Sequence, residues 1–132
     1  GDAILESGAS MHPPIRARFE AGQAVGGAKF VADWQVLDAL RAGFAAQTAG
    51  YDAVLLPTVA ILPPRIEDLL ADDDEFTARN LETLRNTRVG NLMNLTGLTL
   101  PTGTRHCGLM LLCPAGHEAR ALCLGAAVEK TL

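Results

Sequence analysis

Hydrophobic residues recur at helical spacing early in the chain. Between residues 28 and 49 they return at every third or fourth position, at Phe30, Trp34, Leu37, Leu40 and Phe44. This spacing predicts a helix that buries one face. Residues 1–14 show no such period and contain glycine, serine and proline, so they predict a loop. Pro14 suits the first turn of a short helix that runs to Ala21 and is broken by Gly22.

A short apolar run follows the first long helix. Residues 51–56 are mostly hydrophobic and are stopped by Pro57, a pattern typical of a strand that is covered on both faces. A helix that leads into such a strand through a single glycine indicates an α/β fold. Residues 57–66 contain three prolines and predict an ordered loop without regular structure.

The second half of the chain predicts two helices and a hairpin. One long helix should begin in the acidic cluster at residues 72–75, because leucines follow it at helical spacing: Leu81, Leu84, Leu92 and Leu95. Residues 98–101 and 107–113 read as strands joined by a turn, which predicts a hairpin. The last helix should span 117–130, a segment rich in alanine and leucine.

Length and composition fit one folded domain. The chain has 132 residues, of which 48% are hydrophobic and 20% charged, close to the soluble globular average. We therefore expect a single domain over 1–132, with a loop and short helix in 1–27 and a helix–strand–helix–hairpin–helix order in 28–132.

Charge and cysteine content exclude several classes of partner. The net charge of -4 offers no positive field for nucleic acid or anionic lipid, and no apolar run reaches the length of a membrane span. The cysteines, Cys107, Cys113 and Cys123, are odd in number and form no CxxC pair. We expect no disulfide framework and a cytoplasmic protein that binds neither nucleic acid nor membrane.

The sequence contains no recognisable catalytic or metal site. Its two serines, Ser7 and Ser10, lack a nucleophile elbow, and its two lysines lie far along the chain from both. His106 and Cys107 are adjacent, so on a strand their side chains would point to opposite faces. The histidines lack metal-binding spacing and the acidic cluster lacks the spacing of a calcium loop. We predict no catalytic residue, no metal and no cofactor in this chain.

Four segments, in chain order, resemble one enzyme family. They are residues 51–58 (YDAVLLPT), 85–93 (RNTRVGNLM), 98–103 (LTLPTG) and 108–120 (GLMLLCPAGHEAR). They are similar to the "YDALLTPT", "RNT..xN", "(V/I)SLPxG" and "GLQLIGPxGxEAxLL" segments of amidase-signature enzymes. The resemblance covers residues 51–129 and is looser before them. A second register matches residues 94–98 to "NLTGLPA" but needs a deletion before Pro101, so we prefer the register without a gap.

The resemblance implies the C-terminal part of an α/β/α sandwich with a mixed sheet, in which three or so strands are covered by long helices. Such enzymes hydrolyse the C–N bond of a small-molecule amide to an acid and ammonia or an amine. A lysine acts through a cis-serine on a nucleophilic serine, and backbone N–H groups hold the oxyanion. No counterpart of that serine-rich signature occurs here. The triad would therefore lie upstream, and the isolated chain should be inactive.

By position in the family pattern, three residues are candidates for the wall of the substrate pocket: Thr58, Thr87 and Asn91. The structural alternative is that Thr58 only ends a strand and that Asn91 only caps a helix. Two other functions stay open. One is a subunit of a glutamine-dependent amidotransferase, and the other is a noncatalytic α/β interaction domain. In the isolated chain, unpaired strand edges should favour self-association or packing on a missing N-terminal part.

Overall fold

The computed structural model describes residue 6 and residues 11–132 of the chain. Ser7 and Ser10, and most of the loop predicted over 1–14, lie outside the described residues. The chain divides into two compact units, residues 1–36 and residues 37–132. The single domain expected over 1–132 stays a prediction.

The first unit is helical in its described part. Helix α2 spans Pro13–Ala21, a short 3-10 turn η1 spans Gly22–Ala24, and α3 begins at Gly27 and continues to Thr48. Both predicted helices are confirmed. Helix α2 begins one residue earlier than predicted. Prolines are tolerated at its first two positions, because the N–H groups there have no partner within the helix.

The buried face predicted for α3 is wrong in this chain. No residue of α3 is buried, and Phe30 and Leu40 are each 56% exposed. Only its second half is partly covered, at Leu37, Arg41, Phe44 and Thr48. The period correctly identified an apolar face, but Phe30, Trp34 and Leu40 on that face are exposed.

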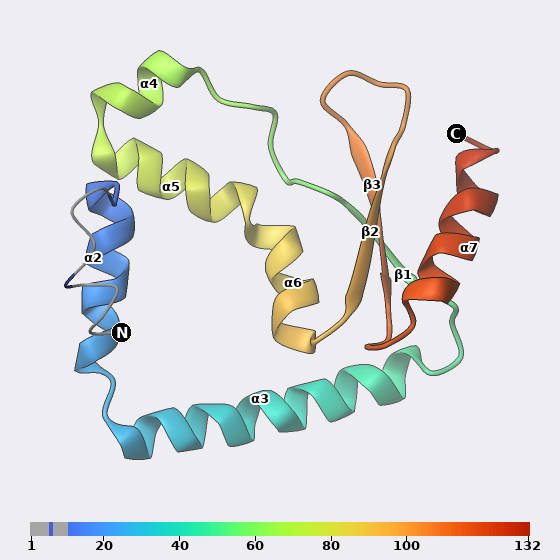
Figure 1. Cartoon of the computed structure of the whole chain (residues 1–132), viewed down its shortest axis with the longest axis horizontal. Helices are drawn as coiled ribbons and strands as arrows, with labels where there is room; N and C mark the ends of the chain where they lie inside the picture. Colours follow the sequence, from blue (N-terminus) through green and yellow to red (C-terminus); the bar gives the residue numbers. More distant parts are fainter. Residues whose placement is uncertain (1–5, 7–10) are drawn as a thin grey trace. The chain divides into compact units, whose positions relative to one another are not determined.

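The second unit contains three strands and four further helices (Figure 1). In chain order they are β1 (Val54–Pro57), α4 (Ile66–Ala71), α5 (Asp73–Thr83), α6 (Arg85–Met93), β2 (Thr96–Pro101), β3 (Gly108–Cys113) and α7 (Glu118–Glu129). The α/β class is therefore confirmed, as are the hairpin and the last helix.

The strands form one sheet in the order β1-β3-β2, and both neighbouring pairs are antiparallel. Leu111 of β3 lies opposite Leu55 of β1 and Leu98 of β2, so these three residues share one face. Leu112 lies opposite Val54 and Gly97 on the other face. The mixed sheet of the resemblance would need a parallel pair, and it stays a prediction for a longer protein.

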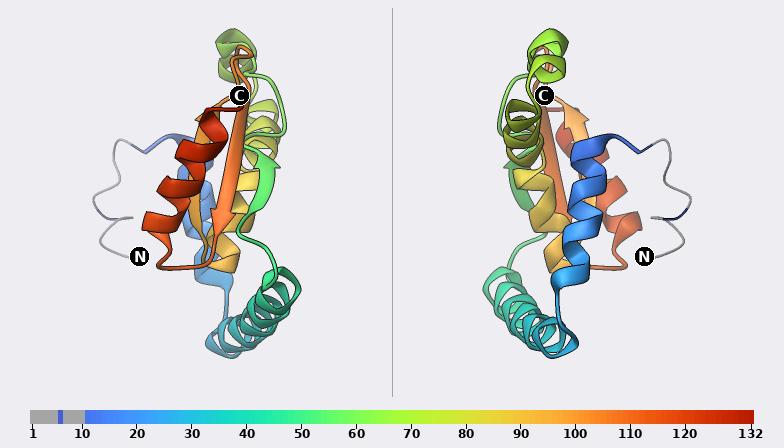
Figure 2. Two further views of the ribbon diagram at one scale, coloured as in Figure 1. Left: turned by 90° about the vertical axis from the view of Figure 1, so that its right-hand side faces the viewer. Right: turned by 90° about the vertical axis from the view of Figure 1, so that its left-hand side faces the viewer.

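A helix covers each face of this sheet (Figure 2). Helix α7 lies on the face of Leu98, so closely that a Cβ at Gly125 would collide with the Leu98 Cδ2 atom. Helix α6 lies on the opposite face, where a Cβ at Gly90 would come within 3.2 Å of the Leu112 Cδ2 atom. Close approach at two glycines thus produces an α/β/α arrangement around buried β3.

The expectation that β1 is covered on both faces is wrong. Leu55 is 53% exposed, because β1 is an edge strand and α7 packs on β2 and β3. The single helix expected from residue 72 is also wrong. It breaks at Leu84, whose ψ of -2° departs from helical geometry, and α6 ends at Asn94, which adopts a left-handed conformation with φ of 55°.

The acidic cluster does begin a helix, as predicted. The Asp72 side chain accepts hydrogen bonds from the backbone N–H groups of Asp74 (2.8 Å) and Glu75 (3.3 Å), so it is the N-cap of α5. Helix α4, which precedes it, was not predicted. It has six residues, too few to show a hydrophobic period.

Candidate functional site

The predicted pocket residues come from the end of β1 and from α6. Thr58 directly follows β1, and its backbone N–H donates to the carbonyl oxygen of Gly108 at 2.8 Å. Its hydroxyl donates to the Thr99 hydroxyl of β2 at 3.4 Å. The structure therefore places Thr58 beside both other strands, at the end of the sheet where β1 ends and β3 begins.

A third polar side chain reaches the same end of the sheet from α6. The Asn86 amide donates to the carbonyl oxygen of Pro57 at 2.8 Å. This bond holds the start of α6 against the end of β1. Asn86 is the residue before Thr87. We refer to Thr58, Asn86 and Thr99 as the polar strip.

The other two predicted residues take part in the local structure of α6. The Thr87 hydroxyl donates to the Leu84 carbonyl oxygen at 3.2 Å, and the Asn91 carbonyl oxygen accepts from the Asn94 N–H at 3.3 Å. Thr87 and Asn91 are four residues apart and so share one helix face, next to the face that carries Asn86 and Gly90. Within residues 11–132, no hydrogen bond joins Thr58 to Thr87 or Asn91. Their role as a pocket wall stays a prediction.

Gly108 allows the two threonines of the polar strip to approach each other. A Cβ at this position would lie 2.8 Å from the Thr58 hydroxyl oxygen and 3.2 Å from the Thr99 methyl carbon. The strip therefore offers two hydroxyls and one amide, which can donate and accept hydrogen bonds but do not change protonation near neutral pH. It can orient a neutral polar group, and it cannot act as a general acid or base.

Sequence reasoning missed Asn86 and Thr99 as members of this strip. Asn86 belongs to the "RNT" segment, which was the available signal. Thr99 had no local signal, because only the pairing of β2 with β3 brings it to Thr58. Among the described residues, no three His, Cys, Asp or Glu side chains come together to form a potential metal site. Each described helix is too short or too polar to traverse a lipid bilayer.

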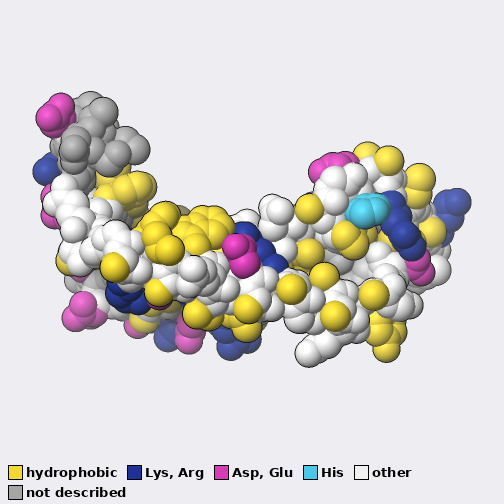
Figure 3. Space-filling view, turned by 90° about the horizontal axis from the view of Figure 1, so that it is seen from below, with side chains coloured by type: hydrophobic (Ala, Val, Ile, Leu, Met, Phe, Trp, Pro, Cys, Tyr) yellow, Lys and Arg dark blue, Asp and Glu magenta, His cyan; other side chains and the backbone are white. Residues whose placement is uncertain are grey.

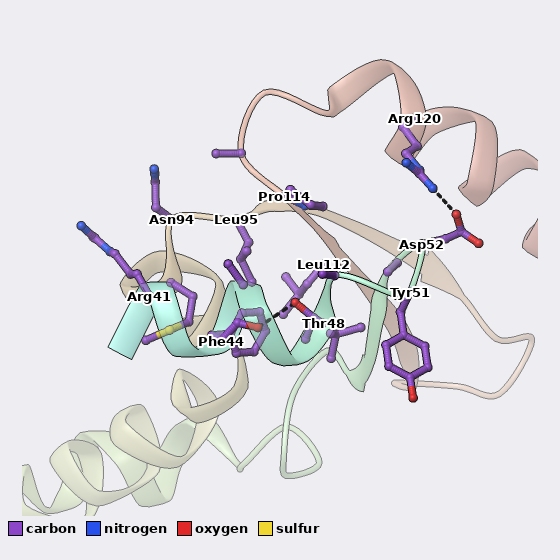
Figure 4. A pocket seen from close by; sticks show the side chains of 17 residues that line it. Arg41, Phe44, Thr48, Tyr51, Asp52, Asn94, Leu95, Leu112, Pro114 and Arg120 are labelled. Carbon is purple, nitrogen blue, oxygen red and sulfur yellow. Dashed lines mark hydrogen bonds and ion pairs between the residues drawn. The ribbon is translucent and has the colours of Figure 1, made fainter. Parts of the chain in front are cut away.

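A cavity in the second unit lies at the other end of the sheet, where β1 begins and β3 ends (Figure 4). Its volume is about 430 Å³. Three separate stretches of chain line it: the C-terminal half of α3 with the turn into β1, the end of α6 with the two residues that follow, and the end of β3 with the following turn and Arg120. The side chains of Phe44, Leu95 and Leu112 form its apolar centre.

Charged groups lie around this apolar centre. Arg120 of α7 forms an ion pair with Asp52, which precedes β1. On another side of the cavity, the Arg41 guanidinium donates to the Leu92 carbonyl oxygen at 2.8 Å. The lining thus holds two arginines and one aspartate, and Arg41 also forms an ion pair with Asp38 at 3.3 Å, so each arginine has an acidic partner.

Cys113 lies behind the ion pair and is fully buried. Its thiol donates to the Asp52 carbonyl oxygen at 3.6 Å. Burial raises the pKa of the Cys113 thiol, because the thiolate would lose its hydration; Asp52 adds to this rise and Arg120 opposes it. Cys113 therefore remains a neutral thiol in the folded protein and is not an activated nucleophile.

The sequence is similar to part of a longer protein. No family model matches the chain, and no solved structure matches it at a significant level. Over 123 residues the chain is 29% identical to a protein of Comamonas testosteroni named 2-amino-5-chloromuconic acid deaminase. The match covers 90% of this chain and 26% of that protein, so the chain spans about a quarter of its length. The chain is thus similar to one part of a longer protein that is named as a deaminase.

Proposed function

We propose that this chain is the C-terminal part of an amidase, which hydrolyses the C–N bond of a small-molecule carboxamide. One observation carries the proposal. The four segments that resemble amidase-signature enzymes form consecutive parts of one packed arrangement: β1, α6, β2, and β3 with α7. They adjoin each other in space, as parts of one sheet and its covering helices would. Similarity to part of a longer deaminase supports the same reading, since deamination also releases nitrogen from carbon.

In this proposal, the chain supplies a scaffold and not the reacting groups. Residues 11–132 contain no serine, so none of them could act as the nucleophilic serine of the family mechanism. The nucleophilic serine, the cis-serine and the lysine base would come from a preceding segment. Thr58, Thr87 and Asn91 would then form one wall of the pocket, and the polar strip would orient the neutral amide.

A segment exchange with the Comamonas deaminase tests the proposal. The matched segment of that enzyme is replaced by this chain, and ammonia release from the enzyme's own substrate is measured. We expect the chimera to retain activity that a deaminase lacking the segment does not have. The 132-residue chain alone should release no ammonia from any carboxamide above the buffer rate. A soluble, folded chimera as inactive as the truncated enzyme would contradict the proposal, as would turnover by the chain alone.

A second candidate reaction follows from the name of the relative. The whole protein would release ammonia from a small amino-substituted unsaturated acid, as the name of the Comamonas protein describes. The two candidates differ in the bond that is broken, so an active protein containing this chain should be assayed with a carboxamide and with an amino-substituted muconic acid. Hydrolysis of the carboxamide alone would exclude the second candidate.

The amidotransferase subunit and the noncatalytic interaction domain stay as alternative predictions. Glutamine-dependent ammonia release would favour the former, and a native protein consisting of these residues alone would favour the latter. In the isolated chain, the open edges of β1 and β2 should cause self-association. Sedimentation at increasing concentration tests this, and a monomer at high concentration would count against it.

A further inference from the structure

The cavity between the second half of α3, the start of β1 and the end of β3 has the dimensions of a small-molecule site. Its volume of about 430 Å³ lies within the usual range for such sites, about 300–1,000 Å³. Its centre consists of Phe44, Leu95 and Leu112, which favour an aromatic or aliphatic body. All of its lining residues belong to the second unit.

The rim of this cavity presents a cation that a ligand could engage at low cost. Arg120 lines the cavity and is paired with Asp52, but the two side chains are 49% and 69% exposed. An ion pair this exposed contributes only about 0–1 kcal/mol, so its guanidinium can transfer to another carboxylate with little loss. Figure 4 shows Arg120 and Asp52 together on one side of the apolar centre.

We propose that this cavity binds a small molecule with an apolar body and one carboxylate. The body lies against Phe44, Leu95 and Leu112, and the carboxylate competes with Asp52 for Arg120. A planar guanidinium binds a carboxylate through two parallel hydrogen bonds, which gives the site its preference for an acid over a neutral analogue. This site lies at the opposite end of the sheet from the polar strip, and it does not depend on the proposed amidase function.

Calorimetric titration of the 132-residue chain with two probes tests the proposal. The probes are 4-phenylbutanoate and the neutral 4-phenylbutan-1-ol, which share one apolar body. We expect both to bind, and the acid to bind more tightly by about threefold, which is within the range that a single exposed charge contact contributes. Equal affinities, or no binding of either probe at millimolar concentration, would overturn the proposal.

Filling the cavity gives a matched pair of variants. Ala45 is exposed and lines the cavity, whereas its neighbour Ala46 is exposed and does not line it. Ala45→Leu should weaken both probes by at least about tenfold through the loss of space for the shared body. Ala46→Leu, with the same change in composition, should leave both affinities unchanged. Equal effects of the two substitutions would place the probes elsewhere and overturn the proposal.

Two charge variants should act in opposite directions. Arg120→Gln should abolish the preference for the acid without changing the affinity for the alcohol. Asp52→Asn should tighten the acid by removing its competitor, so the proposal stays testable even if one variant fails to fold. Arg105→Gln, in the exposed turn between β2 and β3, is the control and should change nothing. An unchanged preference for the acid in both Arg120→Gln and Asp52→Asn would show that Arg120 does not hold the carboxylate.

Discussion

Helices α3 and α7 are both rich in alanine, and each contains a glycine in its interior, yet they are packed differently. In α7, Ala121 and Gly125 are buried against the sheet, and a Cβ at Gly125 would collide with the Leu98 side chain. In α3 no residue is buried, and a Cβ at Gly43 would meet nothing within 4 Å. The same residue type therefore permits close packing in one helix and only weakens the other.

The difference lies in the side chains that each helix presents. Ala121 and Gly125 are four residues apart and form a flat face on which β2 fits. Helix α3 instead projects large side chains, among them Phe30 and Trp34, whose rings pack edge to face 6.2 Å apart. Hydrophobic side chains lie at the surface along α3, between charged ones (Figure 3). A hydrophobic period thus identifies the face a helix would bury, but not whether the chain provides the surface that buries it.

The largest effect should come from the core beneath α7. Leu111 is 2% exposed, whereas Leu40 of α3 is 56% exposed. Leu111→Ala should lower the free energy of unfolding by about 2–5 kcal/mol, since it removes buried surface and leaves a cavity. Leu40→Ala should change it by no more than about 0.5 kcal/mol. Urea unfolding followed by circular dichroism measures both, and similar losses would mean that α3 is buried in solution.

The two glycines give the next largest effect, with opposite signs. Gly125→Ala should destabilise the protein by about 1–2 kcal/mol, because overpacking against Leu98 exceeds the gain in helix propensity. Gly43→Ala has only the propensity gain and should stabilise the protein by up to about 1 kcal/mol. Thermal unfolding of the two variants measures both changes. If both variants were stabilised, α7 would be packed less closely than the structure indicates.

A smaller effect depends on pH. Burial raises the pKa of the Cys113 thiol above its ordinary value of 9.0. Above pH 9.0 the thiol therefore ionises in the unfolded chain before it ionises in the folded protein. The contribution of Cys113 to stability is complete below that pH and is lost as the pH rises above it. Stability should therefore fall above about pH 9, by at most about 1.4 kcal/mol per pH unit from this group. Cys113→Ala should remove that slope, and Cys123→Ala, at an exposed position of α7, should not. Urea midpoints between pH 7 and about pH 10 provide the measurement.

The smallest effect concerns the ion pair between α7 and the residue before β1. Asp52→Asn should cost no more than about 1 kcal/mol, because both partners are largely exposed. The loss should shrink further in 1 M salt, where the Debye length is about 3 Å. A larger loss that salt does not reduce would mean that Asp52 acts through its packing and not through its charge.

The elements of the second unit were largely predictable, because each depends on local spacing and on punctuation by glycine or proline. The hairpin of residues 96–113 and the helix that follows it were found in this way. The break at Leu84 was not predictable, since helical spacing continues across it. The burial of individual side chains was not predictable either, because it depends on contacts between segments that are distant in the sequence. Leu55 was expected to be buried on the strength of its neighbours alone, and it is exposed.

The candidate site was predictable only in part, for the same reason. Thr58 was proposed by its position in a family pattern, but Thr99, whose hydroxyl accepts its hydrogen bond, lies 41 residues further along the chain. Asn86 bonds to Pro57, from which it is separated by 29 residues. Only the strand register and the packing of α6 bring them to one end of the sheet. The cavity is harder still, since it is formed by residues from three separate stretches, none of which has a distinctive local pattern.

The prolines that end the two outer strands determine where this sheet can be extended. The Thr58 N–H donates to the Gly108 carbonyl oxygen, so the backbone groups of every second residue of β1 point toward β3. The backbone groups of Leu55 and Pro57 therefore point away from the sheet. Of these two residues only Leu55 has an N–H donor, because proline has none. By the same alternation, Gly97, Thr99 and Pro101 of β2 direct their backbones outward, and the first two have donors. A further strand, from another copy or another segment, would therefore find a longer template along β2. Both edges are open, but the edge along β2 offers more backbone donors than the edge along β1.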